Sequence, residues 1–157
     1  MSVKQAIDSG GFLDSGNISS SSALRSNTTL SLQPSIFTTV PFPILLNGSE
    51  NINGITQNAG IFTNTSTSTL TVSISYTVSF PFNAVGDRAA RIFTSTSGNY
   101  NIGYNFLDTN DSNNTIMTGS ATIILAPSQT FNIGVYQTSN VALQLDTNFV
   151  TIQIVAF

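Results

Sequence analysis

Apolar and polar residues alternate with a period of two along most of this chain. In the longest run, residues 70–82, one parity is apolar and the other carries hydroxyl groups: Leu70, Val72, Ile74, Tyr76, Val78, Phe80 and Phe82 against Thr71, Ser73, Ser75, Thr77 and Ser79. Such alternation predicts a strand with one buried face and one hydroxyl-covered face. Shorter runs, separated by clusters of turn residues, lie at 36–46, 59–63, 89–95, 100–107, 115–126, 129–138, 140–146 and 149–157.

These runs predict an all-β fold, because no segment shows the 3.6-residue period of an amphipathic helix. The spacing of strands and turns indicates an antiparallel jelly-roll sandwich of about 8–10 short strands. We place this head domain at 34–157. Residues 1–33 combine Gly, Ser, Asn and Thr with isolated apolar residues, and we expect a low-complexity, irregular N-terminal arm. The alternatives for it are a disordered tail and an arm that docks on a neighbour or larger particle.

The last predicted strand is apolar on both faces. One parity holds Val150, Ile152, Ile154 and Ala156, while the other places Phe149, Val155 and Phe157 around Thr151 and Gln153. A strand covered on both sides in a domain without helices needs a second protein surface. We therefore expect this sheet to pack against copies of the same chain. The alternative is that the N-terminal arm covers the second face.

Composition removes most catalytic chemistry. Only 7% of the 157 residues are charged, the net charge is −3, and Cys, His and Trp are absent. These absences exclude Ser-His and Cys-His nucleophiles, zinc sites built from those ligands, and disulfides. We expect no enzymatic activity and no cofactor. Direct nucleic-acid binding is not expected either, because the four cations are scattered: Lys4, Arg25, Arg88 and Arg91.

No membrane span or signal peptide is expected. No apolar run approaches the roughly 20 residues of a membrane span, and residues 1–16 lack the apolar stretch of a signal peptide. Virions and spores are assembled inside a cell and then released, so an extracellular destination remains compatible with this start.

Carboxylates are the remaining option for chemistry, with Asp108, Asp111 and Asp146 as the candidates. General acid catalysis needs one carboxyl group whose pKa is raised by burial, whereas the segment 107–114 is typical of an exposed loop. Asp108 and Asp111 also form a weak calcium candidate, since carboxylate and amide oxygens suit that ion. A polar turn with side chain to backbone hydrogen bonds is the simpler interpretation.

Asp87, Arg88 and Arg91 place half of the cations in one short stretch. An ion pair there is either solvated beside the Gly86 turn or formed across a subunit contact. Sequons for N-glycosylation occur about as often as chance predicts in a chain so rich in Asn, Ser and Thr, at Asn17, Asn27, Asn47, Asn64, Asn110 and Asn113.

Two segments resemble the trimeric globular heads of complement and of tumour necrosis factor (TNF). The string NAGIFT at 58–63, followed by the long strand ending near Phe82, is similar to the opening of those jelly rolls. The tail GSATIILAPSQTFNIGVYQTSNVALQL, then NFVTIQIVAF, resembles their closing strands. The resemblance covers about 34–157.

The resemblance implies a homotrimer in which the sheet with the first and last strands faces the three-fold axis. By that resemblance the interface candidates are Phe37, Phe42, Phe149, Thr151, Gln153, Val155 and Phe157. The chain has no collagen repeat, so a secreted regulator on a collagen stalk is not expected. Similar heads occur on spore-surface filaments and on viral particles.

We therefore expect a structural protein of a particle surface, such as a virion capsid, decoration or fibre head. Its partners would be its own copies and, through the arm, a larger particle or coat protein. The alternatives are a spore-surface or filament subunit, a capsid shell subunit, and an attachment head that binds a receptor or glycan. Tyr100 and Tyr104 near Asp108 are the aromatic group proposed for a glycan, although their alternation with Ile102 and Phe106 favours the core.

Overall fold

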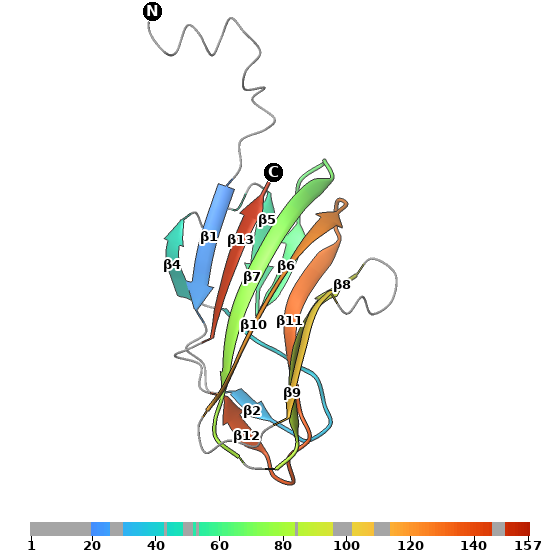
Figure 1. The fold of residues 1–157 in the computed structure, drawn as a ribbon. Coiled ribbons are helices and arrows are strands. Elements are labelled where there is room, and N and C mark those ends of the chain that lie inside the picture. The colour runs from blue at the N-terminus through green and yellow to red at the C-terminus, as the bar shows by residue number, and fades with distance from the viewer. Residues whose placement is uncertain are drawn as a thin grey trace, which may run out of the picture.

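The chain folds into two antiparallel sheets packed face to face (Figure 1). The computed structural model describes residues 20–25, 30–42, 44–48, 52, 54–83, 85–95, 102–108, 114–145 and 150–157. Its first seven strands are β1 (Ser20–Arg25), β2 (Leu30–Leu32), β3 (Thr38–Thr39), β4 (Ile44–Gly48), β5 (Ile55–Asn58), β6 (Ile61–Asn64) and β7 (Leu70–Phe80). The others are β8 (Asp87–Thr94), β9 (Ile102–Asp108), β10 (Thr115–Leu125), β11 (Thr130–Gln137), β12 (Leu143–Leu145) and β13 (Thr151–Ala156).

The order of strands is that of a jelly roll. One sheet runs β10-β7-β13-β1-β4, and we call it the first sheet. The second sheet runs β5-β6-β11-β8-β9, with β3 also paired to β11, and β12 pairs with β2 in a small ribbon. Strands distant in the sequence therefore lie side by side, as β1 does with β13. The predicted all-β jelly-roll fold is confirmed.

The core lies between the two sheets and follows from the alternation along each strand. In β7, Val72, Ile74 and Val78 are buried while Thr71 and Ser75 are exposed. The second sheet contributes Ile92 and further buried side chains of β6, β8 and β11, namely Phe62, Ala90, Phe131, Ile133 and Val135. Removing this apolar surface from water is the main driving force for folding.

Most predicted strands appear close to their expected bounds, and the differences have local reasons. The run 36–46 divides into β3 and β4, with Pro41 between them, because proline cannot donate to a strand ladder. β5 was not predicted, since Ile55 is the only apolar residue in it. The described residues contain no helix, and so none that is long and apolar enough to span a membrane.

Two strands fall within the range expected to be an arm. β1 lies between β13 and β4, where Leu24 is buried. β2 pairs with β12, and Leu32 is fully enclosed. β1 therefore extends the edge of β13 and does not cover its second face. Residues 1–19 lie outside the described residues, and the arm remains a prediction for them.

Polar side chains enclosed in the head are held by backbone groups. Arg88 is fully buried, and its guanidinium donates to the carbonyl oxygens of Asn83 (3.2 Å), Val85 (3.3 Å) and Asp87 (2.9 Å). Burial lowers the pKa of Arg88, and neighbouring Asp87 opposes that shift. Arg88 thus stabilises the loop before β8 within its own subunit. The sequence predicted that Arg88 forms an ion pair, either solvated or across a subunit contact. Its burial and its backbone partners fit neither alternative.

The sequon at Asn64 lies in the core. Its amide nitrogen donates to the carbonyl oxygens of Ser68 (2.9 Å) and Leu125 (2.8 Å), and its oxygen accepts from the backbone of Ser66 (2.9 Å). The side chain is fully buried. Because both ends of the amide are used inside the protein, Asn64 is unavailable to a glycan in the folded head.

Candidate assembly face

The outward face of the first sheet is built from three rows of side chains that cross β10, β7 and β13. The register of these strands aligns Thr118, Thr77 and Thr151 in one row, Ser120, Ser75 and Gln153 in the next, and Thr122, Ser73 and Val155 in the third. All nine side chains are partly or fully exposed. We call this three-strand surface the assembly face. It is the hydroxyl-covered side predicted from the alternation in 70–82.

Two neighbouring hollows make the assembly face a shallow groove along β7. Their volumes are about 550 Å³ and 460 Å³, and Ser75, Ser120 and Gln153 line both. None of the described residues that line them is charged. Ser73 and Thr122 are joined across the groove by a hydrogen bond of 3.1 Å between their hydroxyl groups. The groove therefore presents neutral donors and acceptors.

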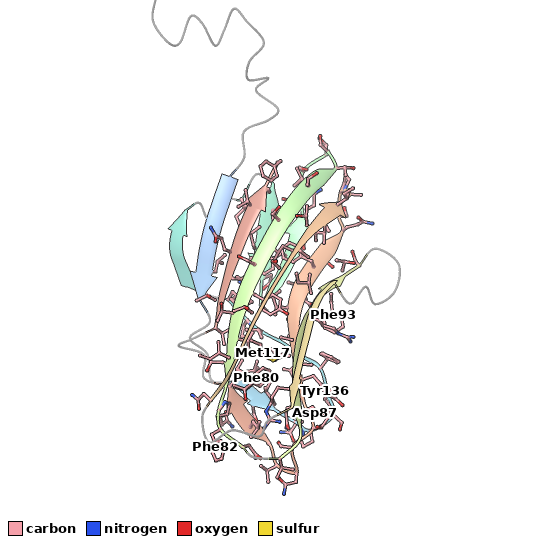
Figure 2. The ribbon with its side chains drawn as sticks, viewed as in Figure 1. Phe80, Phe82, Asp87, Phe93, Met117 and Tyr136 are labelled. Carbon is pink, nitrogen blue, oxygen red and sulfur yellow. The ribbon has the colours of Figure 1, made fainter. Side chains whose placement is uncertain are left out.

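Apolar side chains lie beyond both ends of the groove. At the end where β13 finishes, Ile124 is 70% exposed and Phe157 is 46% exposed. Both flank Thr71. Ile124 is opposite Thr71 in the pairing of β10 with β7, and the backbone of Phe157 is hydrogen-bonded to that of Thr71. Toward the other end, Ile116 and Phe82 are exposed, and Phe82 lies at the lower tip in Figure 2. A polar centre with apolar ends is a surface able to bury area against another protein.

Behind the groove, β7 and β10 are held together by a close fit. Tyr76 points into the core, where its hydroxyl donates to the carbonyl oxygen of Ala90 in the second sheet at 2.9 Å. Burial raises the pKa of Tyr76 to about 12. Gly119 lies opposite Tyr76, and a Cβ atom there would come within 2.5 Å of the tyrosine ring. Glycine at this position allows the close approach.

The predicted interface residues divide between different parts of the head. Thr151, Gln153 and Val155 lie along β13 on the assembly face, and Phe157 follows β13 at the end of the groove. Their role as an interface stays a prediction. Phe149 is outside the described residues.

Two other candidates lie elsewhere. Phe42 is 1% exposed in the core, with its ring 6.2 Å from that of Phe62, so it is enclosed by its own subunit. Phe37 lies on the outward face of the second sheet, in contact with Phe93 and Tyr136. The apolar run that contains both phenylalanines did not reveal which side of the sandwich each would occupy.

The assembly face also contains residues outside the predicted interface set, on β7 and β10. Ser75 and Ser120 are the central pair, and their register follows from the long antiparallel pairing of these two strands. The sequence did contain a signal for them. The hydroxyl side chains of 70–82 alternate with apolar ones, so they lie on the side of the strand that faces away from the core. The neighbouring strand cannot be identified from alternation alone.

The carboxylate candidates form no described site. Asp108 ends β9 with its Cα opposite that of Asp87, while Asp111 and Asp146 fall outside the described residues. No group of three or more potential metal-ligating side chains occurs in the part of the chain that the structure describes. The calcium pair stays a prediction. Tyr100 is likewise outside, and for Tyr104 only the backbone, within β9, is described.

Solved structures with the same fold include heads of the TNF and complement types. Murine APRIL at pH 5.0 matches with a TM-score of 0.68 and 11% identity, over 89% of this chain and 100% of that chain. Eiger TNF from S. frugiperda matches with a TM-score of 0.57, 9% identity and coverage of 87% and 91%. The globular domain of the zebrafish complement 1qA protein matches with a TM-score of 0.55 and 12% identity, over 88% of this chain and 95% of that chain. No protein-family model and no curated protein sequence matches.

Proposed function

We propose that this chain, a jelly roll with the fold of the TNF and complement heads, is a non-enzymatic structural head that assembles as a homotrimer through its assembly face. The observation that carries the proposal is the neutral groove over β10, β7 and β13, flanked by the exposed Ile124 and Phe157. Heads that this sequence resembles are usually homotrimers, with the sheet of the first and last strands facing the axis. Here that sheet contains both β1 and β13.

The chemistry of the groove suits contact between identical copies. In a trimer each subunit contacts its two neighbours through different patches, and only side chains close to the three-fold axis meet their own copies. Like charges would repel there, whereas hydroxyl and amide groups both donate and accept hydrogen bonds and can pair with their own kind. Ser75, Ser120 and Gln153 are groups of this type. Ile124 and Phe157 would add apolar burial at one end.

We further propose that the assembled head belongs to the surface of a particle such as a virion, attached through its N-terminal segment. Support comes from the surface chemistry: with 7% charged residues, the head depends little on ionised groups for solubility. β1 starts opposite Ala156 at the end of β13, so the strand begins at the end of the head where Phe157 lies. Electron microscopy of the purified protein distinguishes separate trimers from shells and filaments.

A matched pair of charge substitutions tests the assembly face. Ser75→Lys places three ammonium groups near one axis, whereas Thr56→Lys adds the same charge at an exposed position of β5 in the second sheet. Size-exclusion chromatography with light scattering at micromolar concentration should give a trimer for the wild type and Thr56→Lys and a monomer for Ser75→Lys. A monomeric wild type, or a trimeric Ser75→Lys variant, contradicts the proposal. Circular dichroism confirms that both variants fold.

A further inference from the structure

Gln153 occupies the middle of the assembly face. It is the only long polar side chain among the nine that form this surface, and it lines both of the neighbouring hollows. In the register of the sheet it lies between Ala23 of β1 and Ser75 of β7. The residues on either side of it in β13, Ile152 and Ile154, are buried in the core. Gln153 therefore projects outward where the two hollows adjoin.

The amide of Gln153 is free within its own subunit. Other glutamines use theirs inside the head: Gln57 donates to the carbonyl oxygen of Phe42 at 2.7 Å, and Gln129 accepts from the backbone of Ala126 at 2.8 Å. Among the described residues, none forms a hydrogen bond with the side chain of Gln153, which is exposed. When another subunit covers the groove, this amide loses its water and needs a protein partner, because a buried amide without one is costly.

A three-fold axis allows three copies of one amide to satisfy each other. A side-chain amide carries both N–H donors and an acceptor oxygen. Each copy can therefore donate to the next and accept from the previous one, which closes a ring with identical contacts in every subunit. A carboxylate has no donor and an ammonium group has no acceptor, so neither can close such a ring.

The length of the side chain decides which residue can form this ring. Three glutamine amides joined by hydrogen bonds of about 2.9 Å hold their Cα atoms roughly 10–12 Å apart. The backbones of sheets packed face to face lie about 10 Å apart. A ring of serine or threonine hydroxyl groups requires Cα atoms about 7 Å apart, which is too close for packed sheets. Among the side chains of the assembly face, only Gln153 combines a donor, an acceptor and sufficient reach.

We propose that Gln153 lies at the three-fold axis of the assembly, where three Gln153 amides close a ring of hydrogen bonds. The inference rests on the homotrimer proposed above and adds the residue that fixes its symmetry and register. A single buried polar position can set the register and the number of subunits of an assembly. The ring is neutral, as are the described residues that line the groove around it.

An engineered zinc site tests the position of the axis directly. The chain contains no His and no Cys, so the wild type lacks the usual nitrogen and sulfur ligands of zinc. Gln153→His places three imidazole groups around one axis, and three His side chains are a known ligand set for zinc. The untagged full-length variant should bind one Zn²⁺ per three chains in equilibrium dialysis. Gln144→His makes the same change at an exposed position of β12 and should bind no zinc at that ratio.

Gln153→Glu tests the ring through its protonation. A protonated carboxyl group has a donor and an acceptor and can close the ring, whereas ionised carboxylates at the axis repel each other. The dissociation constant of this variant, measured by analytical ultracentrifugation, should rise by about tenfold or more from pH 5 to pH 8. The wild type and Gln144→Glu should change by less than about threefold. The described lining of the groove is uncharged, and Arg25, which is opposite Thr151 in the register, keeps its charge across this range.

Two outcomes overturn the inference while the assembly itself stands. One is a Gln153→His protein that binds no zinc at one ion per three chains, and the other is a Gln153→Glu protein that associates no more tightly at pH 5 than at pH 8. Either result would place the axis at another part of the groove. A monomeric wild type contradicts the homotrimer instead, and light scattering on the same samples detects it, so the two failures are distinguishable. Circular dichroism confirms that every variant folds.

Discussion

At the scale of single residues, Tyr76 connects the two sheets through the core. It is 3% exposed, and its hydroxyl reaches the carbonyl oxygen of Ala90 on β8. Desolvation disfavours the phenolate, which is why the pKa rises to about 12 from its usual value of 10.0. The folded head therefore holds this proton more tightly than the unfolded chain does.

That difference predicts a loss of stability in strong alkali. Between pH 10 and 12 the unfolded chain releases the proton of Tyr76 while the folded head retains it, so the free energy of unfolding falls as pH rises. The full effect is roughly 2–3 kcal/mol. Urea unfolding at a series of pH values from 9 to 12 measures it, and Tyr76→Phe should have a flatter profile than the wild type. Parallel profiles would mean that Tyr76 is not the responsible group.

Residue types alone predicted burial poorly for charged and amide side chains. Arg88 was expected to pair with a carboxylate, whereas its two terminal nitrogens donate to three backbone carbonyl groups. Every residue type carries a backbone carbonyl group, so such acceptors leave no signature in the sequence. Asn64 is similar, because its partner at Leu125 is 61 positions away along the chain. Only the folded arrangement of loops shows why either side chain is enclosed.

At the scale of elements, alternation predicted the long strands and several short ones but missed β1, β2 and β5. β7 and β10, with 11 residues each, show enough repeats for the period to be clear. β1 reads Ser-Ser-Ser-Ala-Leu-Arg and has almost no apolar pattern. It forms a strand because β13 and β4 offer backbone partners on both sides. Tertiary pairing here overrides weak local preference.

The placement of β1 predicts that the head depends on it. Leu24→Ala removes a side chain that is 8% exposed and part of the core cluster, so it should lower the free energy of unfolding by about 2–4 kcal/mol. Ile36→Ala, at a position 56% exposed, should change it by less than about 0.5 kcal/mol. Chemical denaturation measures both. Equal, small effects would mean that residues 20–25 contribute little to the stability of the head and belong to the predicted arm.

At the scale of the whole molecule, the two outward faces differ in what they offer. The assembly face is neutral and long, and is suited to contact with another copy. The opposite face carries a small hollow beside the rings of Phe37 and Phe93. The sequence predicted the polarity of the first face from the parity of β7. It did not predict the hollow, which combines residues of β3, β8 and β11 that come together only in the sheet.

The neutral groove predicts an assembly that responds little to salt. Since no described residue lining it is charged, the dissociation constant of the oligomer should change by less than about threefold between 50 mM and 500 mM NaCl. Analytical ultracentrifugation at both concentrations measures this. Ser75→Lys and Thr56→Lys supply the comparison, because any residual assembly of Ser75→Lys should strengthen as salt screens the added charges. A strong salt dependence of the wild type would place ionised groups in the contact.

The neighbouring positions of Ser20 and Ala156 determine which end of the head is useful for display. Because these residues face each other across the β1–β13 pair, a tag fused after Phe157 starts at the same end of the head as β1. The turn around Asn140, between β11 and β12, lies at the far end of the sandwich and is exposed. A peptide epitope grafted there would point away from any support that holds the N-terminus, which makes this turn the better position for presenting a vaccine antigen.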